Sequence, residues 1–152
     1  MSQLRHLREG GLEVHGAHVS VLAQFPAPGN EPVKLICGGD GAVLTYGVAP
    51  VSGGGLATVT FKGIRKIVLG HPNDEALGGH RFASHGLTWF AFHEVSNSDL
   101  IADLKHVNRV HPRHTDELFA GLRHFIATFK EETFECVART LEVSHSKEAE
   151  VA

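Results

Sequence analysis

Cysteine is scarce in this chain, which excludes a disulfide framework as the basis of its fold. Only Cys37 and Cys136 are present among 152 residues, whereas small domains that depend on disulfides carry several pairs. Long apolar runs are also absent, since no stretch approaches the ~20 residues of a membrane-spanning helix. The segment from Met1 to His6 lacks the apolar centre of a signal peptide. We therefore expect a soluble, cytoplasmic protein with two thiols and no membrane partner.

A block of basic residues is missing as well. The chain has 14 Lys and Arg against 17 Asp and Glu, a formal net charge of −3. This argues against a nucleic-acid partner, because phosphate-backbone binding depends on clustered cations. Apolar residues make up 42% of the chain and charged residues 20%, the balance of an ordinary globular domain. The length predicts one domain, which we place at residues 1–143, with a flexible C-terminal tail at 144–152.

Alternating apolar residues and glycine-rich turns predict strands in the first half. The pattern alternates over residues 14–25 and stops at a proline-rich turn. Residues 33–37 and 42–46 flank a glycine-rich turn and predict a hairpin. Residues 57–62 alternate cleanly, and residues 64–69 continue or bend that strand.

The second half mixes helix and strand patterns. Residues 87–95 are apolar on both faces and predict a central strand. A helical period follows to about Val110, with Ser96-x-x-Asp99 as a capping box, and residues 115–121 predict a short second helix. The fold class is therefore α+β and β-rich: a curled antiparallel sheet or small open barrel with one long helix and one short helix.

Residues 124–130 and 133–143 predict a closing hairpin with its turn at Glu131 and Glu132. In this register Phe129 pairs with Phe134, and the face they share belongs to the core. Cys136 lies on that apolar face, which predicts a buried and unreactive thiol. The opposite face is either solvated or lines a pocket; its candidate substrate-binding residues are His124, Thr128, Glu135 and Arg139.

Histidine is abundant, with 12 in the chain, and several follow the strand that ends near residue 70. Loops held between strands often carry reactive groups, and His with carboxylates supplies general acid and base. The candidate catalytic residues are His71, Asp74, Glu75 and His80. An alternative for Asp74 and Glu75 is that they are the acids of a single helical turn.

Histidine also binds metals. A divalent metal such as zinc, iron or manganese would suit these residue types, and the candidate ligands are His71, His80, His111 and His114. The spacing matches no familiar metal motif, nucleotide-binding glycine loop or Gly-x-Ser-x-Gly element, so no nucleotide cofactor is expected. Any one of these histidines is more often a surface, capping or core residue than a ligand.

Three longer patterns occur in the second half: GHPxDExLxGH at residues 70–80, HPxH at 111–114 and HFIxTFxxxTFEC at 124–136. Together they resemble a family of small bacterial proteins of uncharacterised activity. The resemblance covers about residues 69–139. It implies a bacterial origin and a shared site, and it implies no particular reaction.

Two functions remain open. The first is a small-molecule enzyme that uses a His/carboxylate site for acid–base or metal-assisted chemistry, of the lyase, isomerase or hydrolase type. The alternative is a non-catalytic protein that binds a small molecule, a metal or another protein. In either case the expected partner is a small-molecule ligand, and association into a homo-oligomer stays open.

Overall fold

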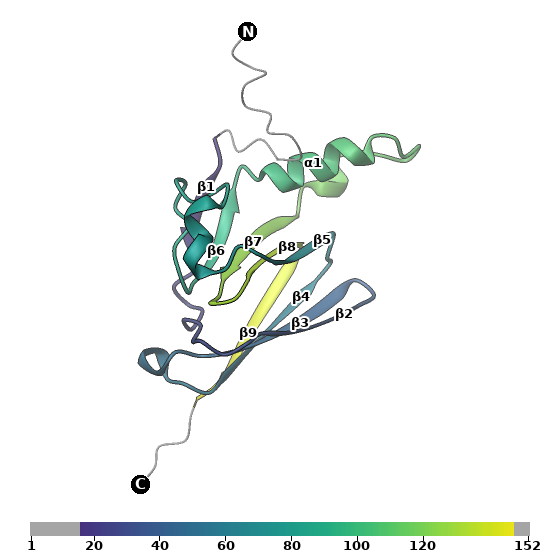
Figure 1. Ribbon diagram of the computed structural model, residues 1–152. Coiled ribbons are helices and arrows are strands. Elements are labelled where there is room, and N and C mark those ends of the chain that lie inside the picture. The colour runs from purple at the N-terminus through teal and green to yellow at the C-terminus, as the bar shows by residue number, and fades with distance from the viewer. Residues whose placement is uncertain (1–15, 148–152) are drawn as a thin grey trace.

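The structure, a computed structural model, describes residues 16–147 and consists mainly of two antiparallel sheets that pack face to face (Figure 1). One sheet has the order β1-β6-β7-β8-β5 and the other β2-β3-β4-β9. The sheets stay open rather than forming a closed barrel over the described residues. The predicted β-rich α+β class is therefore confirmed, with the curled sheet divided into two layers.

The strands are β1 (His18–Val21), β2 (Lys34–Gly38), β3 (Gly41–Gly47), β4 (Leu56–Lys62), β5 (Lys66–Gly70), β6 (Phe92–Ser96), β7 (Arg123–Thr128), β8 (Thr133–Ala138) and β9 (Thr140–Ser146). The long helix is α1 (Asp99–Asn108), and three short 3-10 turns are η2 (Pro50–Ser52), η3 (Asp74–Gly79) and η4 (Asp116–Phe119). No helix within residues 16–147 is long and apolar enough to cross a membrane.

Two strands turn a corner from one sheet into the other. β4 continues as β5 after Gly63, and β8 continues as β9 after Arg139. They stay partnered around the corner, because β4 pairs with β9 while β5 pairs with β8. Gly63 has a φ of 69°, and a Cβ there would lie 2.8 Å from Cγ of Arg139. Glycine is the residue that tolerates both constraints, so this position sets the bend between the sheets.

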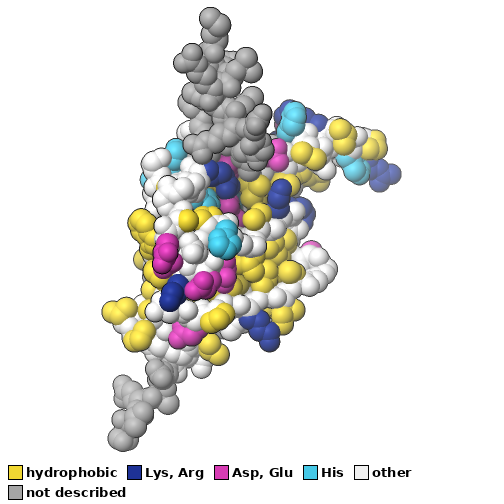
Figure 2. Space-filling model, viewed as in Figure 1, with side chains coloured by type: hydrophobic (Ala, Val, Ile, Leu, Met, Phe, Trp, Pro, Cys, Tyr) yellow, Lys and Arg dark blue, Asp and Glu magenta, His cyan; other side chains and the backbone are white. Residues whose placement is uncertain are grey.

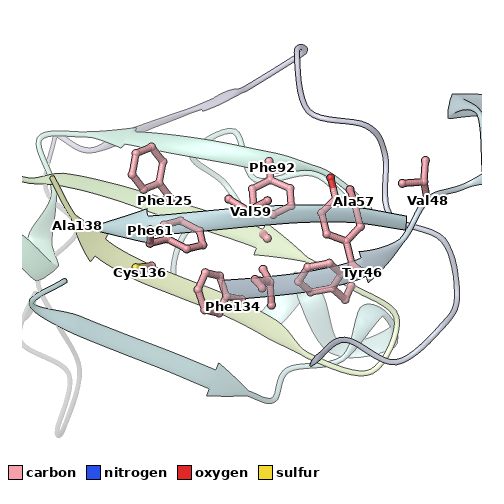
Figure 3. Close-up of a cluster of buried hydrophobic side chains, with 13 residues drawn as sticks. Tyr46, Val48, Ala57, Val59, Phe61, Phe92, Phe125, Phe134, Cys136 and Ala138 are labelled. Carbon is pink, nitrogen blue, oxygen red and sulfur yellow. The ribbon is translucent and has the colours of Figure 1, made fainter. Parts of the chain in front are cut away.

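Aromatic side chains fill the space between the two sheets (Figure 3). Phe61 of β4 packs against Phe134 of β8, with ring centroids 5.4 Å apart. Tyr46 of β3 packs against Phe92 of β6 at 5.3 Å. Cys136 is fully buried in this core, and burial raises the pKa of its thiol to about 12. The prediction of a buried Cys136 is confirmed.

A third layer covers the outer face of the five-stranded sheet. It consists of the segment between β5 and β6 and the start of α1 (Figure 1). Phe82 and Leu87 of that segment pack against Ile126 of β7, and Leu100 of α1 packs against Val137 of β8. All six residues of β8 are therefore buried, and polar side chains on this face are enclosed as well.

The register of the last hairpin differs from the prediction. Ala127 pairs with Phe134 and Thr128 with Thr133, so the predicted pairing of Phe129 with Phe134 is wrong. The turn closes one residue earlier, where the amide of Phe129 donates to the carbonyl of Glu132 at 3.0 Å. The register moves by an even number of residues, so the predicted core face is retained.

Several boundaries also differ. The strand predicted at 14–25 is reduced to β1, and residues 14 and 15 lie outside the described range. The strand predicted at 87–95 is β6, which begins only at Phe92 because the preceding residues form the covering layer. The helix begins after Ser98, so Ser96 is not its cap. The short second helix is the 3-10 turn η4.

β9 runs through Ser146, so residues 144–146 of the predicted tail belong to a strand. The rest of that tail from residue 148, and the first 15 residues of the predicted domain, lie outside the described residues. The predicted hairpin at 33–46 and the strand at 57–62 are confirmed as β2, β3 and β4.

The corner gives a direct test. We expect Gly63→Ala to lower the free energy of unfolding by about 1–3 kcal/mol, because the new Cβ meets Arg139 and alanine is strained at this φ. Gly78→Ala is the matched control, since a Cβ there meets nothing within 4 Å. Urea unfolding of both variants measures the difference, and equal stabilities would contradict this account of the corner.

Candidate functional site

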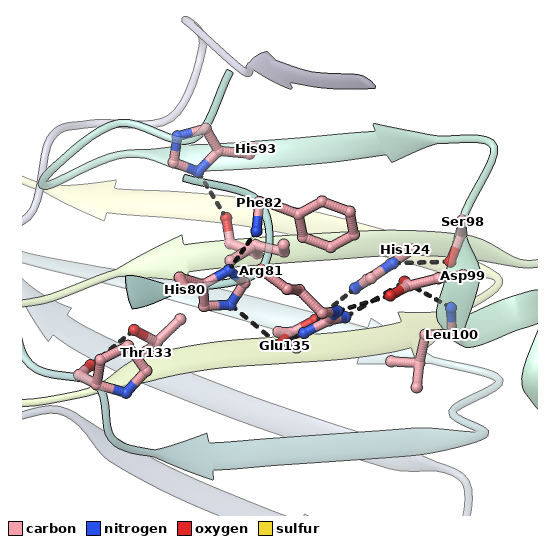
Figure 4. Close-up of polar contacts among 12 residues, drawn as sticks. His80, Arg81, Phe82, His93, Ser98, Asp99, Leu100, His124, Thr133 and Glu135 are labelled. Atoms are coloured by element: carbon pink, nitrogen blue, oxygen red, sulfur yellow. Dashed lines mark hydrogen bonds and ion pairs between the residues drawn. The ribbon is translucent and has the colours of Figure 1, made fainter. Parts of the chain in front are cut away.

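A buried polar cluster lies between the five-stranded sheet and its covering layer (Figure 4). It brings together three parts of the chain: the residues directly after η3, the start of α1, and the hairpin of β7 and β8. We call it the Glu135 cluster; its members are His80, Arg81, Ser98, Asp99, His124 and Glu135.

Glu135 lies at the centre of the cluster, and its side chain is only 8% exposed. One carboxylate oxygen accepts from Nη2 of Arg81 at 2.7 Å, and the other accepts from Nη1 at 2.7 Å. Nε2 of His124 lies at 2.8 Å and Nε2 of His80 at 3.4 Å. Burial acts against ionisation, but the bonds from His124, His80 and Arg81 outweigh it and hold the pKa of Glu135 far below its usual value. Glu135 is therefore a carboxylate.

Arg81 joins this carboxylate to a second one. Its Nε donates to Asp99 at 2.6 Å, and the Asp99 side chain is only 1% exposed. Burial acts to lower the pKa of the Arg81 guanidinium, but the bonds to Glu135 and Asp99 raise it above its usual value. One cation thus compensates two enclosed carboxylates and connects the covering segment to α1.

The hydrogen-bond directions around His124 follow from the ionised Glu135. A carboxylate only accepts, so Nε2 of His124 carries the proton and donates to it. In the neutral ring Nδ1 is then an acceptor, and it lies 2.8 Å from Oγ of Ser98. The amide of Ile101 donates to the same Oγ at 3.0 Å, which leaves the hydroxyl proton of Ser98 for Nδ1 of His124. A continuous chain of donors runs from Ile101 through Ser98 and His124 to Glu135.

Two other enclosed histidines have different surroundings. Nδ1 of His80 accepts from the amide of Phe82 at 3.0 Å. Nε2 of His93 accepts from the amide of Thr88 at 3.0 Å, and its Nδ1 lies 3.0 Å from the carbonyl of Ile126. Protonating either ring would remove an acceptor from a backbone amide. Nδ1 of His124 faces a hydroxyl instead of a backbone amide, and a hydroxyl can either donate or accept.

Ser98 is presented at a sharp connection between a strand and a helix. β6 ends at Ser96, Asn97 adopts a left-handed φ of 53°, and Ser98 is the N-cap of α1. Asparagine tolerates this conformation better than most residues. Ser98 is half-buried, and its hydroxyl lies at the positive end of the helix dipole. A potential nucleophile therefore lies beside a potential base, at a point where developing negative charge is favoured.

Of the predicted catalytic residues, His80 is in the cluster and the others are outside it. His71 and Glu75 are exposed. Asp74 begins η3, and Asn73 caps this turn by accepting from the amide of Ala76 at 3.1 Å. The alternative interpretation of Asp74 and Glu75, as the acids of a single helical turn, describes what these residues do here.

The predicted metal ligands lie in separate places. His111 accepts from the amide of Arg113 in the turn after α1. His114 is held between Asn108 and Asp116, at 2.8 Å from each. His80 belongs to the Glu135 cluster. Between residues 16 and 147 no three His, Cys, Asp or Glu side chains are grouped so as to hold a metal ion, so His71, His80, His111 and His114 do not form one site.

Three of the four predicted substrate-binding residues, His124, Thr128 and Glu135, are buried on the outer face of the sheet. A solvated face is therefore excluded for them. Thr128 donates to the carbonyl of Thr88 at 2.7 Å. This hydrogen bond connects β7 to the covering segment. Arg139 is exposed at the corner, where it donates to the carbonyl of Leu118.

Three members of the cluster were missed from the sequence: Arg81, Ser98 and Asp99. For Ser98 there was a usable signal, because Ser followed by Asp is favourable at the start of a helix. No local pattern marks Arg81, whose partner Glu135 is 54 positions away along the chain.

Comparisons with known proteins return no match among family models, curated proteins or solved structures. The resemblance to small bacterial proteins stays a prediction, and the geometry of the cluster carries the functional argument.

The shared cation gives the first test of the site. We expect Arg81→Met to lower the free energy of unfolding by about 3–5 kcal/mol, because two enclosed carboxylates lose their counter-charge. Glu75→Gln, at an exposed position, should change stability by no more than about 0.5 kcal/mol. Chemical unfolding measures both variants. A loss below about 1 kcal/mol for Arg81→Met would show that the cluster does not hold the layers together.

His93 gives a test by pH. Burial, partly offset by the bond to Ile126, lowers the pKa of His93 below its usual value. The unfolded chain therefore binds a proton at a pH where the folded protein does not. The contribution of His93 to the free energy of unfolding is therefore fully present above about pH 6.5. It falls as the pH drops below this value, by at most about 1.4 kcal/mol per pH unit.

We expect His93→Gln to flatten the decline of unfolding free energy between about pH 6.5 and pH 5. His106→Gln, at an exposed position on α1, should leave the slope unchanged. Thermal or urea unfolding across this range supplies the slopes. If wild type and His93→Gln decline equally, His93 does not enter the acid response.

Proposed function

We propose that the protein is a serine hydrolase of small-molecule esters or amides, with Ser98 as nucleophile, His124 as general base and Glu135 as the group that orients and charge-balances His124. This narrows the predicted small-molecule enzyme with a His/carboxylate site to one of its three reaction types. The observation that carries the proposal is the 2.8 Å contact between Oγ of Ser98 and Nδ1 of His124, the nitrogen left unprotonated by the bond to Glu135.

In the first step Oγ of Ser98 attacks the acyl carbon, and its proton passes to Nδ1 of His124. The imidazolium is stabilised by the carboxylate of Glu135 at 2.8 Å. His124 then gives the proton to the leaving alcohol or amine as the bond to the acyl carbon breaks. Water attacks the acyl-serine, its proton passes to His124, and the proton returns to Ser98 as the acid leaves.

The surroundings of Ser98 favour this chemistry electrostatically. The oxyanion of the tetrahedral intermediate forms at the N-terminus of α1, where the helix dipole favours negative charge. Asp99 would oppose that effect, but its charge is compensated by Arg81 at 2.6 Å. The two ring nitrogens have exchanged the roles they have in chymotrypsin-like triads. The chemistry requires only that the nitrogen facing serine be unprotonated.

A second candidate is a non-catalytic protein that binds a small molecule, a metal or another protein. One observation favours it: every buried side-chain nitrogen and oxygen among the described residues has a hydrogen-bond partner. In that case the cluster is structural, and Ser98 acts only as a helix cap.

The two candidates differ in the reactivity of Ser98. We expect a fluorophosphonate probe to add once per chain, at Ser98, with hydrolysis of p-nitrophenyl esters as a parallel readout. Ser98→Asn should abolish labelling and reduce turnover by about 10²-fold or more. Asparagine is as good an N-cap as serine, so this variant should fold with nearly unchanged stability. Ser96→Asn, at an exposed position two residues earlier, is the matched control and should retain labelling.

Mass spectrometry of the labelled protein identifies the modified residue. Wild-type protein that takes up no probe, or Ser98→Asn protein that labels like wild type, would refute the hydrolase and favour the second candidate. Elemental analysis of protein purified without a histidine tag would then separate a metal-binding protein from one that binds organic ligands or partners.

A further inference from the structure

The two sheets leave four edge strands, which differ in how they are protected. An edge strand offers unpaired backbone groups to another chain unless it is covered, charged or very short. The edge of β1 is covered, because the amide of Val19 donates to the carbonyl of His85 at 2.9 Å. β5 begins with the cation Lys66, and a second cation, Arg65, directly precedes it. The exposed residues of β9 are polar: Thr140, Glu142, Ser144 and Ser146.

β2 is also an open edge, with a single cation, Lys34, at its start. Its register with β3 is continuous from Lys34 to Gly38, and no proline interrupts it. Ile36 is 60% exposed and pairs with Val43 of β3, which is 37% exposed on the same face. Figure 1 shows β2 at the outer edge of its sheet with no helix over it, and Figure 2 shows hydrophobic side chains reaching the surface of the described part.

The charges at the two ends of β2 are opposite. Lys34 begins the strand, and Asp40 lies in the turn that follows it; both are exposed. An antiparallel copy of the same strand would bring each end beside the opposite end of its partner. β5 has cations at its start but no carboxylate close to its other end. The first acidic residue after Gly70 is Asp74. This charge pattern favours a second copy of the chain over an unrelated peptide.

We propose that β2 is a homodimer interface, in which two copies pair antiparallel around a two-fold axis at Ile36 and join their four-stranded sheets into one. In this register Ile36 lies opposite Ile36 of the partner copy, and Lys34 lies opposite Gly38 of the partner copy. Asp40 of the partner copy lies in the two-residue turn directly beyond that Gly38, at the end of the partner strand that Lys34 faces. No like charges face each other, as a self-complementary interface requires.

Sedimentation velocity over a range of concentrations tests the proposal, with a reductant present because Cys37 is an exposed free thiol. We expect wild type to form a dimer as concentration rises. Ile36→Lys should raise the dissociation constant by about tenfold or more, because like charges would meet at the axis. Val51→Lys, at a side chain that is 93% exposed in η2, adds the same charge elsewhere and should dimerise like wild type.

A charge-reversal cycle tests the register. Lys34→Asp and Asp40→Lys should each weaken the dimer, and the double variant should restore it, because the opposite charges again meet across the axis. Circular dichroism and thermal unfolding establish that each variant is folded. Wild type that stays monomeric throughout, a dimer that Ile36→Lys leaves unchanged, or a double variant no stronger than the single variants would overturn the proposal. None of these results depends on whether Ser98 is a nucleophile.

Discussion

The guanidinium of Arg81, placed between two enclosed carboxylates, is the interaction on which the rest of the outer layer depends. It contacts Glu135 on the sheet and Asp99 on the helix, at 2.7 and 2.6 Å. Without this cation, two negative charges would remain in a poorly hydrated space, which is strongly unfavourable. The covering segment buries the outer face of the sheet with apolar side chains such as Phe82 and Leu87, and it also brings the cation that Glu135 needs.

The ionised state of Glu135 then determines the chemistry available beside it. A carboxylate at this position requires a proton on Nε2 of His124, and this leaves Nδ1 to accept from Ser98. The same cation that stabilises the layers therefore also prepares a base next to a hydroxyl. The charge balance of the cluster and the tautomer of His124 therefore both depend on the ionised Glu135 beside Arg81.

Much of the fold was predictable from local patterns. The hairpin of β2 and β3, the strand β4 and the body of α1 each depend on a period of two or of 3.6 residues. Predictions that required a partner were less accurate: the pairing of Phe129 was wrong, and the strand predicted at 87–95 was too long. In that segment Leu87 is buried against the outer face of the sheet, not within it. A buried cover and a buried strand have the same apolar composition, so only the chain path distinguishes them.

The candidate site was likewise predictable from the sequence only in part. Alternation along β7 and β8 was enough to place His124, Thr128 and Glu135 on one face, because an even shift of register leaves faces unchanged. Asn73, Asp74 and Glu75 could likewise be interpreted as a helical turn from their order alone. The sequence by itself determined which residues share a strand face and where the long helix lies. Only the tertiary structure decided that Arg81, 54 positions from Glu135, would neutralise it, because contacts between distant segments depend on how the layers pack and leave no local periodicity.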